Sequence, residues 1–88
     1  MFKTVDLINR VKAAYCLESD YATAKKLGIT KQAMSRYMNK GYILDDKVAV
    51  TVAELLDLEP LQILACMHVE RAERKEDTKL ISFWMRYA

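Results

Sequence analysis

The chain contains only three strong helix breakers, Gly28, Gly41 and Pro60, and they divide it into a few long segments. Within these segments apolar residues recur at spacings of three and four, and few stretches show the β-branched alternation of a strand. Apolar residues make up 52% of the 88 positions, which is enough for a core without disulfide staples. The sequence therefore predicts one all-α domain over residues 1–88, a compact bundle of five or six helices.

Apolar periodicity and capping residues predict where these helices lie. In chain order they are Thr4–Leu17, Tyr21–Leu27, a helix capped by Thr30 that ends near Lys40, one opening at Asp45 or Asp46, one with Pro60 in its first position, and a final apolar segment at Leu80–Tyr87. Thr4 is expected as the first N-cap, and Ser19 or Asp20 as the second. Glu70–Lys79 holds four acids and four bases, so we expect a solvated helical surface or a turn there.

Positive charge is concentrated around Gly28. The formal net charge of the chain is only +2, so any case for nucleic-acid binding depends on where the charge lies. From residue 25 to residue 40 the chain has five basic residues and no acid: Lys25, Lys26, Lys31, Arg36 and Lys40. A surface that approaches a phosphate backbone has to exclude acids. A charge run is also often no more than a solvated face, so charge alone leaves both interpretations open.

Two short helices joined by a tight turn at Gly28 form a candidate helix-turn-helix. Ala24 supplies the small side chain needed where the two helices cross. The second helix is expected to turn its apolar residues to the core: Ile29, Met34 and Tyr37, with Met38 alongside. Its other face carries Lys31, Gln32, Ser35 and Arg36, followed by Asn39 and Lys40. Gln can pair with adenine, and Arg and Lys with guanine, so this face has the chemistry to read base edges in the major groove.

The stretch ATAKKLGITKQAMSRYMNKG resembles the helix-turn-helix of Cro- and repressor-type (Xre-like) DNA-binding proteins of phages and other mobile elements. The downstream VAVTVAELLDLEP is similar to the fourth helix of that family and to the acid-Pro start of its fifth. Together the resemblance covers about Thr4–Ala65. It implies a lambda-repressor-like fold and a sequence-specific regulator of transcription. Such a protein is most often a repressor that reads the major groove of a palindromic double-stranded DNA operator as a homodimer.

The resemblance also implies roles for individual residues. Base-contacting and near-phosphate positions match Thr30, Lys31, Gln32, Ser35 and Arg36. Phosphate contacts early in the first helix of the motif, Tyr21–Leu27, match Tyr21 and Thr23, and backbone contacts match Asn39 and Lys40. Many family members have Gln at the start of the first helix of the motif, where this chain has Asp20 or Tyr21. Because an acid there would repel DNA, we interpret Asp20 as a cap that satisfies the helix dipole. Tyr37 stands where the family often has Trp.

The C-terminal segment Leu80–Ala88 is apolar over most of its circumference. Its polar residues, Ser82 and Arg86, fall with Lys79 on one narrow stripe. A small domain can bury one face of such a helix but not the whole arc, and a large exposed apolar patch usually marks an interface. We therefore expect the protein to be a homodimer, with residues 61–88 as its dimerisation region. The expected interface residues are Leu80, Phe83, Trp84 and Tyr87, with Trp84 as an anchor. The alternative is a tail packed entirely on its own subunit.

Several other functions have no support in the sequence. No nucleophile pairs with the sole histidine, His68, and no phosphate-cradling glycine loop is present, so we expect no enzyme, no cofactor and no small-molecule substrate. Cys66 and His68 are two residues apart on a helix and cannot share a metal ion, so no metal site is assigned. Cys16 and Cys66 are expected as two buried free thiols. With no signal peptide and no segment for a membrane span, the protein is expected to be cytoplasmic.

The main rival to DNA binding is an Xre-like domain that has kept the fold but binds another protein, such as an antitoxin or an anti-repressor, since fold does not imply function. Three tyrosines, Tyr15, Tyr37 and Tyr42, are expected to be core or partly buried packing residues and not to stack on bases. His68 is expected to be a packed or hydrogen-bonded side chain.

Overall fold

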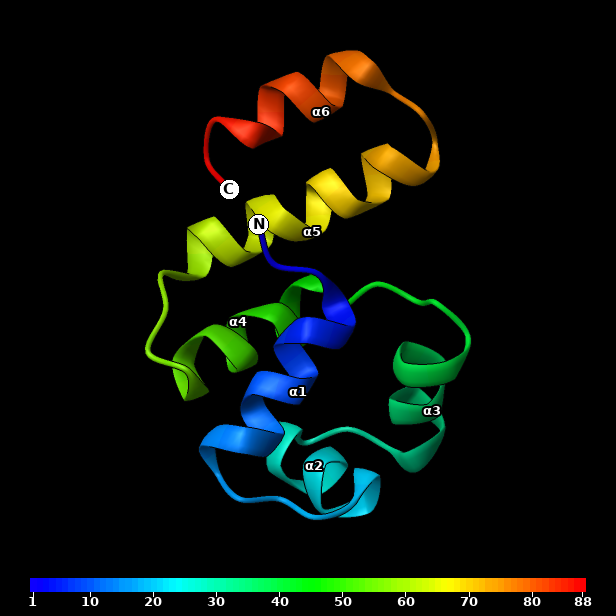
Figure 1. The fold of residues 1–88 in the computed structure, drawn as a ribbon, viewed down its shortest axis with the longest axis vertical. Coiled ribbons are helices and arrows are strands. Elements are labelled where there is room, and N and C mark those ends of the chain that lie inside the picture. Colours follow the sequence, from blue (N-terminus) through cyan, green and yellow to red (C-terminus); the bar gives the residue numbers. More distant parts are fainter.

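Six α-helices and no strand make up the structure, a computed structural model that describes all residues 1–88 (Figure 1). The helices are α1 (Thr4–Ala14), α2 (Asp20–Leu27), α3 (Lys31–Asn39), α4 (Asp46–Leu55), α5 (Pro60–Arg74) and α6 (Thr78–Met85). The predicted all-α bundle of five or six helices is confirmed. The charged stretch Glu70–Lys79, expected as a helical surface or a turn, contains the end of α5, the turn after it and the first two residues of α6.

Local capping signals place most of the helix starts. The side-chain oxygens of Ser19, Thr30 and Asp45 accept the backbone N–H three residues on, each at 3.0 Å. Pro60 occupies the first turn of α5, as predicted. These contacts satisfy backbone donors that no helix can satisfy for itself.

The first helix departs from its prediction at both ends. Its N-cap is Lys3 and not Thr4, whose buried hydroxyl is turned inward. The helix stops at Ala14 because Cys16 takes up a left-handed conformation with φ of 53°, which lets the Leu17 N–H donate to the Lys12 carbonyl at 2.9 Å. Cys16 is therefore exposed, and the prediction that it is a buried thiol is wrong. Cys66 is buried as predicted, and both cysteines are free.

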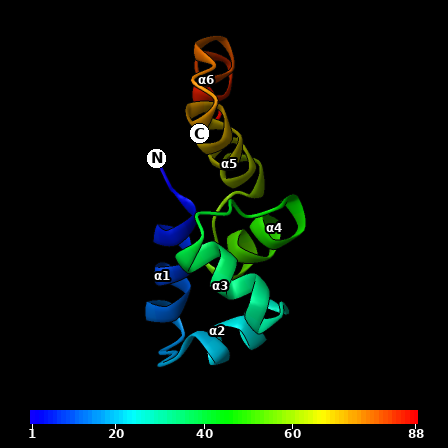
Figure 2. The same ribbon diagram turned by 90° about the vertical axis from the view of Figure 1, so that its right-hand side faces the viewer.

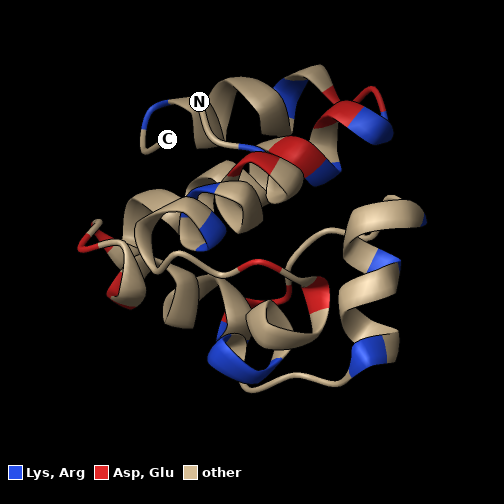
Figure 3. Cartoon of the chain, turned by 60° about the horizontal axis from the view of Figure 1, so that its bottom comes forward, with Lys and Arg blue, Asp and Glu red and all other residues tan.

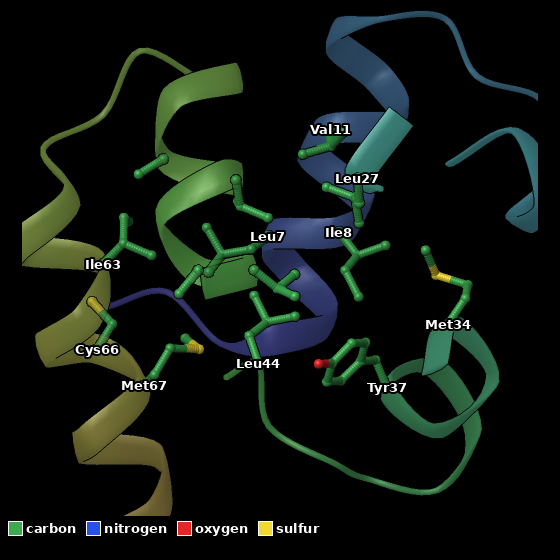
Figure 4. Close-up of a cluster of buried hydrophobic side chains, with 14 of the residues drawn as sticks. Leu7, Ile8, Val11, Leu27, Met34, Tyr37, Leu44, Ile63, Cys66 and Met67 are labelled. Carbon is green, nitrogen blue, oxygen red and sulfur yellow. The ribbon is translucent and has the colours of Figure 1, made fainter. Parts of the chain in front are cut away.

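The helices form two tiers around α5. In both views α1–α4 lie on one side of α5, and α6 lies on the other (Figures 1 and 2). The main core fills the space between the first five helices (Figure 4). Its members from α5 are Ile63, Cys66 and Met67. Ala65 and Val69 are also fully buried but lie outside this core cluster, on the face of α5 that α6 covers.

The segment between α3 and α4 is fastened to α5. The Arg71 guanidinium donates to the Leu44 carbonyl at 2.6 Å, and Arg74 donates to the Gly41 carbonyl. The Leu44 N–H in turn donates to the Thr4 hydroxyl at 3.3 Å. These bonds fix where the chain leaves α3, so they help to hold that helix in place against the domain.

Candidate nucleic-acid interface

The turn between α2 and α3 is closed by Gly28. Its φ is 71°, and the N–H groups of Gly28 and Ile29 donate to the carbonyls of Lys25 and Ala24 at 3.2 and 3.0 Å. A Cβ at Gly28 would meet nothing within 4 Å, so the left-handed backbone and not lack of space calls for glycine here. Ala24 is buried, and α2 packs directly on α3, as the small-residue spacing predicted.

The orientation of α3 is set by its apolar side. Met34 and Tyr37 are buried and point from α3 into the core, towards Ile8 and Leu44 (Figure 4). Burial removes the Tyr37 phenol from water and raises its pKa, and the nearby negative charge of Asp45 raises it further. The opposite side is open to solvent, and all six of its predicted residues are exposed: Lys31, Gln32, Ser35, Arg36, Asn39 and Lys40.

The exposed basic residues near the turn have no acidic partners. The structure contains three ion pairs, Lys3–Glu73, Lys12–Asp20 and Arg74–Glu70. None of them involves the five bases between residues 25 and 40. Figure 3 shows α3 with basic segments and no acidic ones. This stretch therefore presents uncompensated positive charge, whereas several bases elsewhere are already engaged by the protein.

Tyr21 lies between two of these cations. The Lys25 and Lys31 ammonium groups are 5.5 and 5.7 Å from the centre of its ring, which is exposed. Attraction between a cation and an aromatic face favours these positions. Tyr21 thus links the first turn of α2 to the start of α3.

Two further tyrosines have the same relation to bases. Lys26 lies 4.3 Å from the ring centre of Tyr15, and Arg36 lies 6.0 Å from that of Tyr42. Tyr15 is 38% exposed and therefore a partly buried packing residue, as predicted, and Tyr37 is buried. Tyr42 is 56% exposed, so the prediction that it packs is wrong. The Tyr15 hydroxyl donates to the Leu55 carbonyl at 2.7 Å, which explains why this ring lies on the surface of α4.

Asp20 is one of two acids beside this surface; the other, Asp45, lines a hollow with Arg36 and Tyr42. Asp20 is the first residue of α2 and forms an ion pair with Lys12 from α1. Together with Tyr21, Lys31, Met34, Ser35 and Asn39 it lines a small open notch between α2 and α3. Its charge is thus offset by Lys12 and by the positive end of α2, which is consistent with its interpretation as an acid that stabilises the helix.

Thr23 is the one predicted contact residue that the structure removes from the surface. It is 0% exposed, and its hydroxyl donates to the Ser19 carbonyl at 2.8 Å. Its side chain cannot reach a phosphate, so its assignment to the DNA-binding set is corrected.

Thr30 remains exposed while its hydroxyl oxygen caps α3, and the Asn39 amide donates to the Ser35 hydroxyl at 3.3 Å.

Tyr21 was predicted as a DNA contact, but the sequence analysis missed that Tyr15, Tyr21 and Tyr42 each lie against basic side chains. The Tyr21–Lys25 pair had a local signal, because residues four apart in a helix are neighbours. Tyr15 and Tyr42 had none, since each meets its cation across a turn or between separate helices.

The predicted dimer surface is divided between Trp84, which packs within its own chain, and other apolar side chains that are exposed. Trp84 stacks on His68 of α5, with ring centroids 4.2 Å apart and planes inclined by 12°, so it anchors α6 within its own chain. His68 is a packed side chain, as expected. Four other large apolar residues of the C-terminal segment, Leu80, Phe83, Met85 and Tyr87, are 43% to 52% exposed.

No cluster of three or more metal-ligating side chains occurs in the chain, and none of the helices has the length and apolar character to cross a membrane. No family model, curated protein or solved structure matches the sequence. The function is therefore inferred from the fold, the exposed charge and the geometry of α2 and α3.

Proposed function

We propose that the protein is a sequence-specific double-stranded DNA-binding regulator of transcription that inserts α3 into the major groove. The observation that carries the proposal is the set of bases between residues 25 and 40, none of them in an ion pair, on the exposed sides of α2 and of α3, a helix whose other side is fixed in the core. Bound DNA releases counterions when such bases neutralise its phosphates, which supplies affinity. Rigid presentation of the helix supplies specificity.

The side chains of α3 divide by their chemistry. Gln32 and Arg36 are suited to paired hydrogen bonds with adenine and guanine edges, and Lys31 to guanine acceptors. The amide groups of the first turn of α3, beside Thr30, suit a phosphate because they carry free donors and the positive end of the helix dipole. Tyr21, Asn39 and Lys40 lie around this face and suit contacts to the DNA backbone.

The regulator acts as a homodimer in this proposal. One domain of this size makes few contacts, whereas a two-fold dimer can meet two half-sites of a palindromic operator, one helical turn of about 34 Å apart or a multiple of it. The exposed apolar residues of the C-terminal segment support residues 61–88 as the dimerisation region. Because its target is chromosomal or phage DNA, the protein would act in the cytoplasm.

The proposal is tested by fluorescence anisotropy with duplexes that tile the DNA flanking the protein's own gene, against a shuffled duplex, over a salt series. We expect one duplex to bind at least a hundredfold more tightly than the shuffled one. The double substitution Lys31→Glu, Arg36→Glu should abolish binding, and Arg10→Glu, Lys47→Glu, at exposed positions of α1 and α4, serves as the charge-matched control. A folded protein that binds no duplex at low salt would overturn the proposal and favour an interaction module such as an antitoxin or anti-repressor.

A further inference from the structure

The last helix is attached to the domain through one neighbour. The only helix against which α6 packs extensively is α5, and no residue of α6 is fully buried. The contacts that hold it include the Trp84–His68 stack and the bond from the Gln62 amide to the Ala88 carbonyl, at 3.2 Å, and Ala88, after the end of α6, also packs against the main core. Beneath α6 lie Ala65 and Val69 of α5. The remaining helices share one core and contain no comparable detachable element.

The turn that folds α6 back onto α5 has the same hydrogen-bond pattern as the turn at Gly28. The N–H groups of Glu76 and Asp77 donate to the carbonyls of Glu73 and Ala72 at 3.1 and 3.0 Å. Here, however, the left-handed position is occupied by Glu76, with φ of 53°. A side chain with a Cβ is strained in this conformation, because the Cβ crowds the backbone. The hairpin is therefore closed at the expense of local strain.

One other feature favours a break in the helix: the Asp77 carboxylate accepts from the Leu80 N–H at 3.1 Å and caps α6. The rest of the stretch is compatible with a continuous helix. Residues 70–79 contain no glycine and no proline, and most of them are good helix formers. Glu70 and Arg74 already form a pair one helical turn apart across the end of α5. If residues 75–77 became helical, α5 and α6 would join into one continuous helix from Pro60 to Met85.

We propose that two copies of the chain form their dimer by exchanging α6. In the exchanged dimer the α5–α6 turn straightens, and each α6 packs on α5 of the other chain. The contacts between α5 and α6 of the closed hairpin are then made between chains, including the stack of Trp84 on His68, while the hydrogen bonds of the turn are replaced by helical ones. Exchange of an identical element is a low-cost route to a dimer, and short hinges under strain favour it.

Three gains favour α6 of a second copy as the helix that covers this face of α5. Straightening relieves the left-handed strain at Glu76 and adds helical hydrogen bonds at the hinge. It also brings the two hinge segments together, where Leu80 and Phe83, which are exposed in the closed hairpin, find apolar counterparts. The proposal specifies how the homodimer of the proposed function is built, but it does not depend on DNA binding.

Cross-linking of neighbouring positions distinguishes exchange from an ordinary dimer. In a Cys16→Ser background, Gln62→Cys and Ala88→Cys place two thiols at positions that already contact each other, while Cys66 stays buried. A short bismaleimide should join them, with reaction of both thiols verified by mass. Exchange predicts a covalent dimer on a denaturing gel. A link within one chain overturns the proposal, whether the protein sediments as a monomer or as a dimer of intact hairpins.

A matched pair of substitutions at the hinge gives a second, independent test. Glu76→Gly removes the strain of the left-handed turn and disfavours a continuous helix, so it should raise the dissociation constant of the dimer at least tenfold in sedimentation equilibrium. Glu76→Ala removes the same charge but keeps the strain, and should leave the dimer as strong or stronger. Equal dissociation constants for the two variants would overturn the exchange. An unexchanged dimer that still binds operator DNA would leave the proposed function standing.

Discussion

The carboxylate of Glu70 in α5 caps the first helix from 66 residues further along the chain. One of its oxygens, Oε1, accepts from the Thr4 N–H at 3.0 Å and from the Thr4 hydroxyl at 2.8 Å. Glu70 is only 8% exposed, and its other oxygen faces Arg74 at 3.5 Å. A negative charge at the positive end of α1 is favourable, and the contact joins the start of the chain to the helix that supports α6.

Replacing Glu70 by Ala should destabilise the fold by about 2–4 kcal/mol, because it leaves the buried donors of Thr4 without an acceptor. Urea denaturation measures the change. Glu73→Ala is the matched control, since Glu73 is exposed and pairs with Lys3 on the surface, where such pairs contribute less than about 1 kcal/mol. Equal losses in the two variants would contradict the capping role of Glu70.

Ala24→Leu tests the close crossing of α2 and α3. Ala24 is buried between them, so a larger side chain should force the helices apart and cost about 1–3 kcal/mol through overpacking. Ala13→Leu on the exposed side of α1 makes the same chemical change where there is room, and should have little effect. A variant at residue 24 that melts like the parent would show that the two helices do not approach closely there.

Gly28→Ala tests whether backbone conformation alone demands glycine in the turn. With no atom within 4 Å of the added Cβ, the expected loss is only the cost of a left-handed alanine, about 1–2 kcal/mol. Gly28→Asn should lose less, because Asn tolerates this conformation better. If thermal unfolding showed Asn to be the worse substitution, side-chain crowding would have to replace backbone strain as the explanation.

The buried phenol of Tyr37 should make the fold sensitive to alkaline pH. Its pKa is raised above the ordinary value of 10.0 by burial and by the charge of Asp45. The folded state therefore holds the proton more tightly than the unfolded state, so this contribution to stability is complete below pH 10. It is lost as the pH rises from 10 through the raised pKa.

Urea midpoints of the parent and of Tyr37→Phe, compared between about pH 8 and about pH 11.5, isolate this effect. The parent should lose more stability than Tyr37→Phe above pH 10, while Tyr42→Phe, which alters an exposed ring, should follow the parent. Parallel curves for the parent and Tyr37→Phe would show that the buried phenol does not titrate differently in the two states.

Local signals were sufficient to predict most of the fold. Ser19, Thr30 and Asp45 cap helices through partners only three residues away, and Gly28 determines a turn by its own backbone freedom. Thr4 could not be assigned correctly, because its partner Glu70 is distant in the sequence.

The end of α1 was missed for a related reason, because a cysteine stands where glycine would have marked the turn. In the site, the exposed face of α3 was predictable from its helical period. The burial of Thr23, the placing of Tyr15 and Tyr42 beside bases and the stacking of Trp84 on His68 depend on tertiary contacts that no spacing encodes.

The proposed roles of the α3 side chains predict two distinct kinds of loss. Gln32→Ala and Arg36→Ala remove groups aimed at base edges, so each should cost about 1–3 kcal/mol on the specific duplex and little on a shuffled one. Lys40→Ala removes a phosphate contact, so it should weaken both complexes alike and reduce the salt slope by about 1. Lys47→Ala, an exposed lysine of α4 outside both this surface and the dimerisation region, is the control and should change neither affinity. Affinities of all four variants for both duplexes over a salt series check the division. Equal losses on the two duplexes for Gln32→Ala would remove it from the base-reading set, and a loss confined to the specific duplex for Lys40→Ala would move that residue into it.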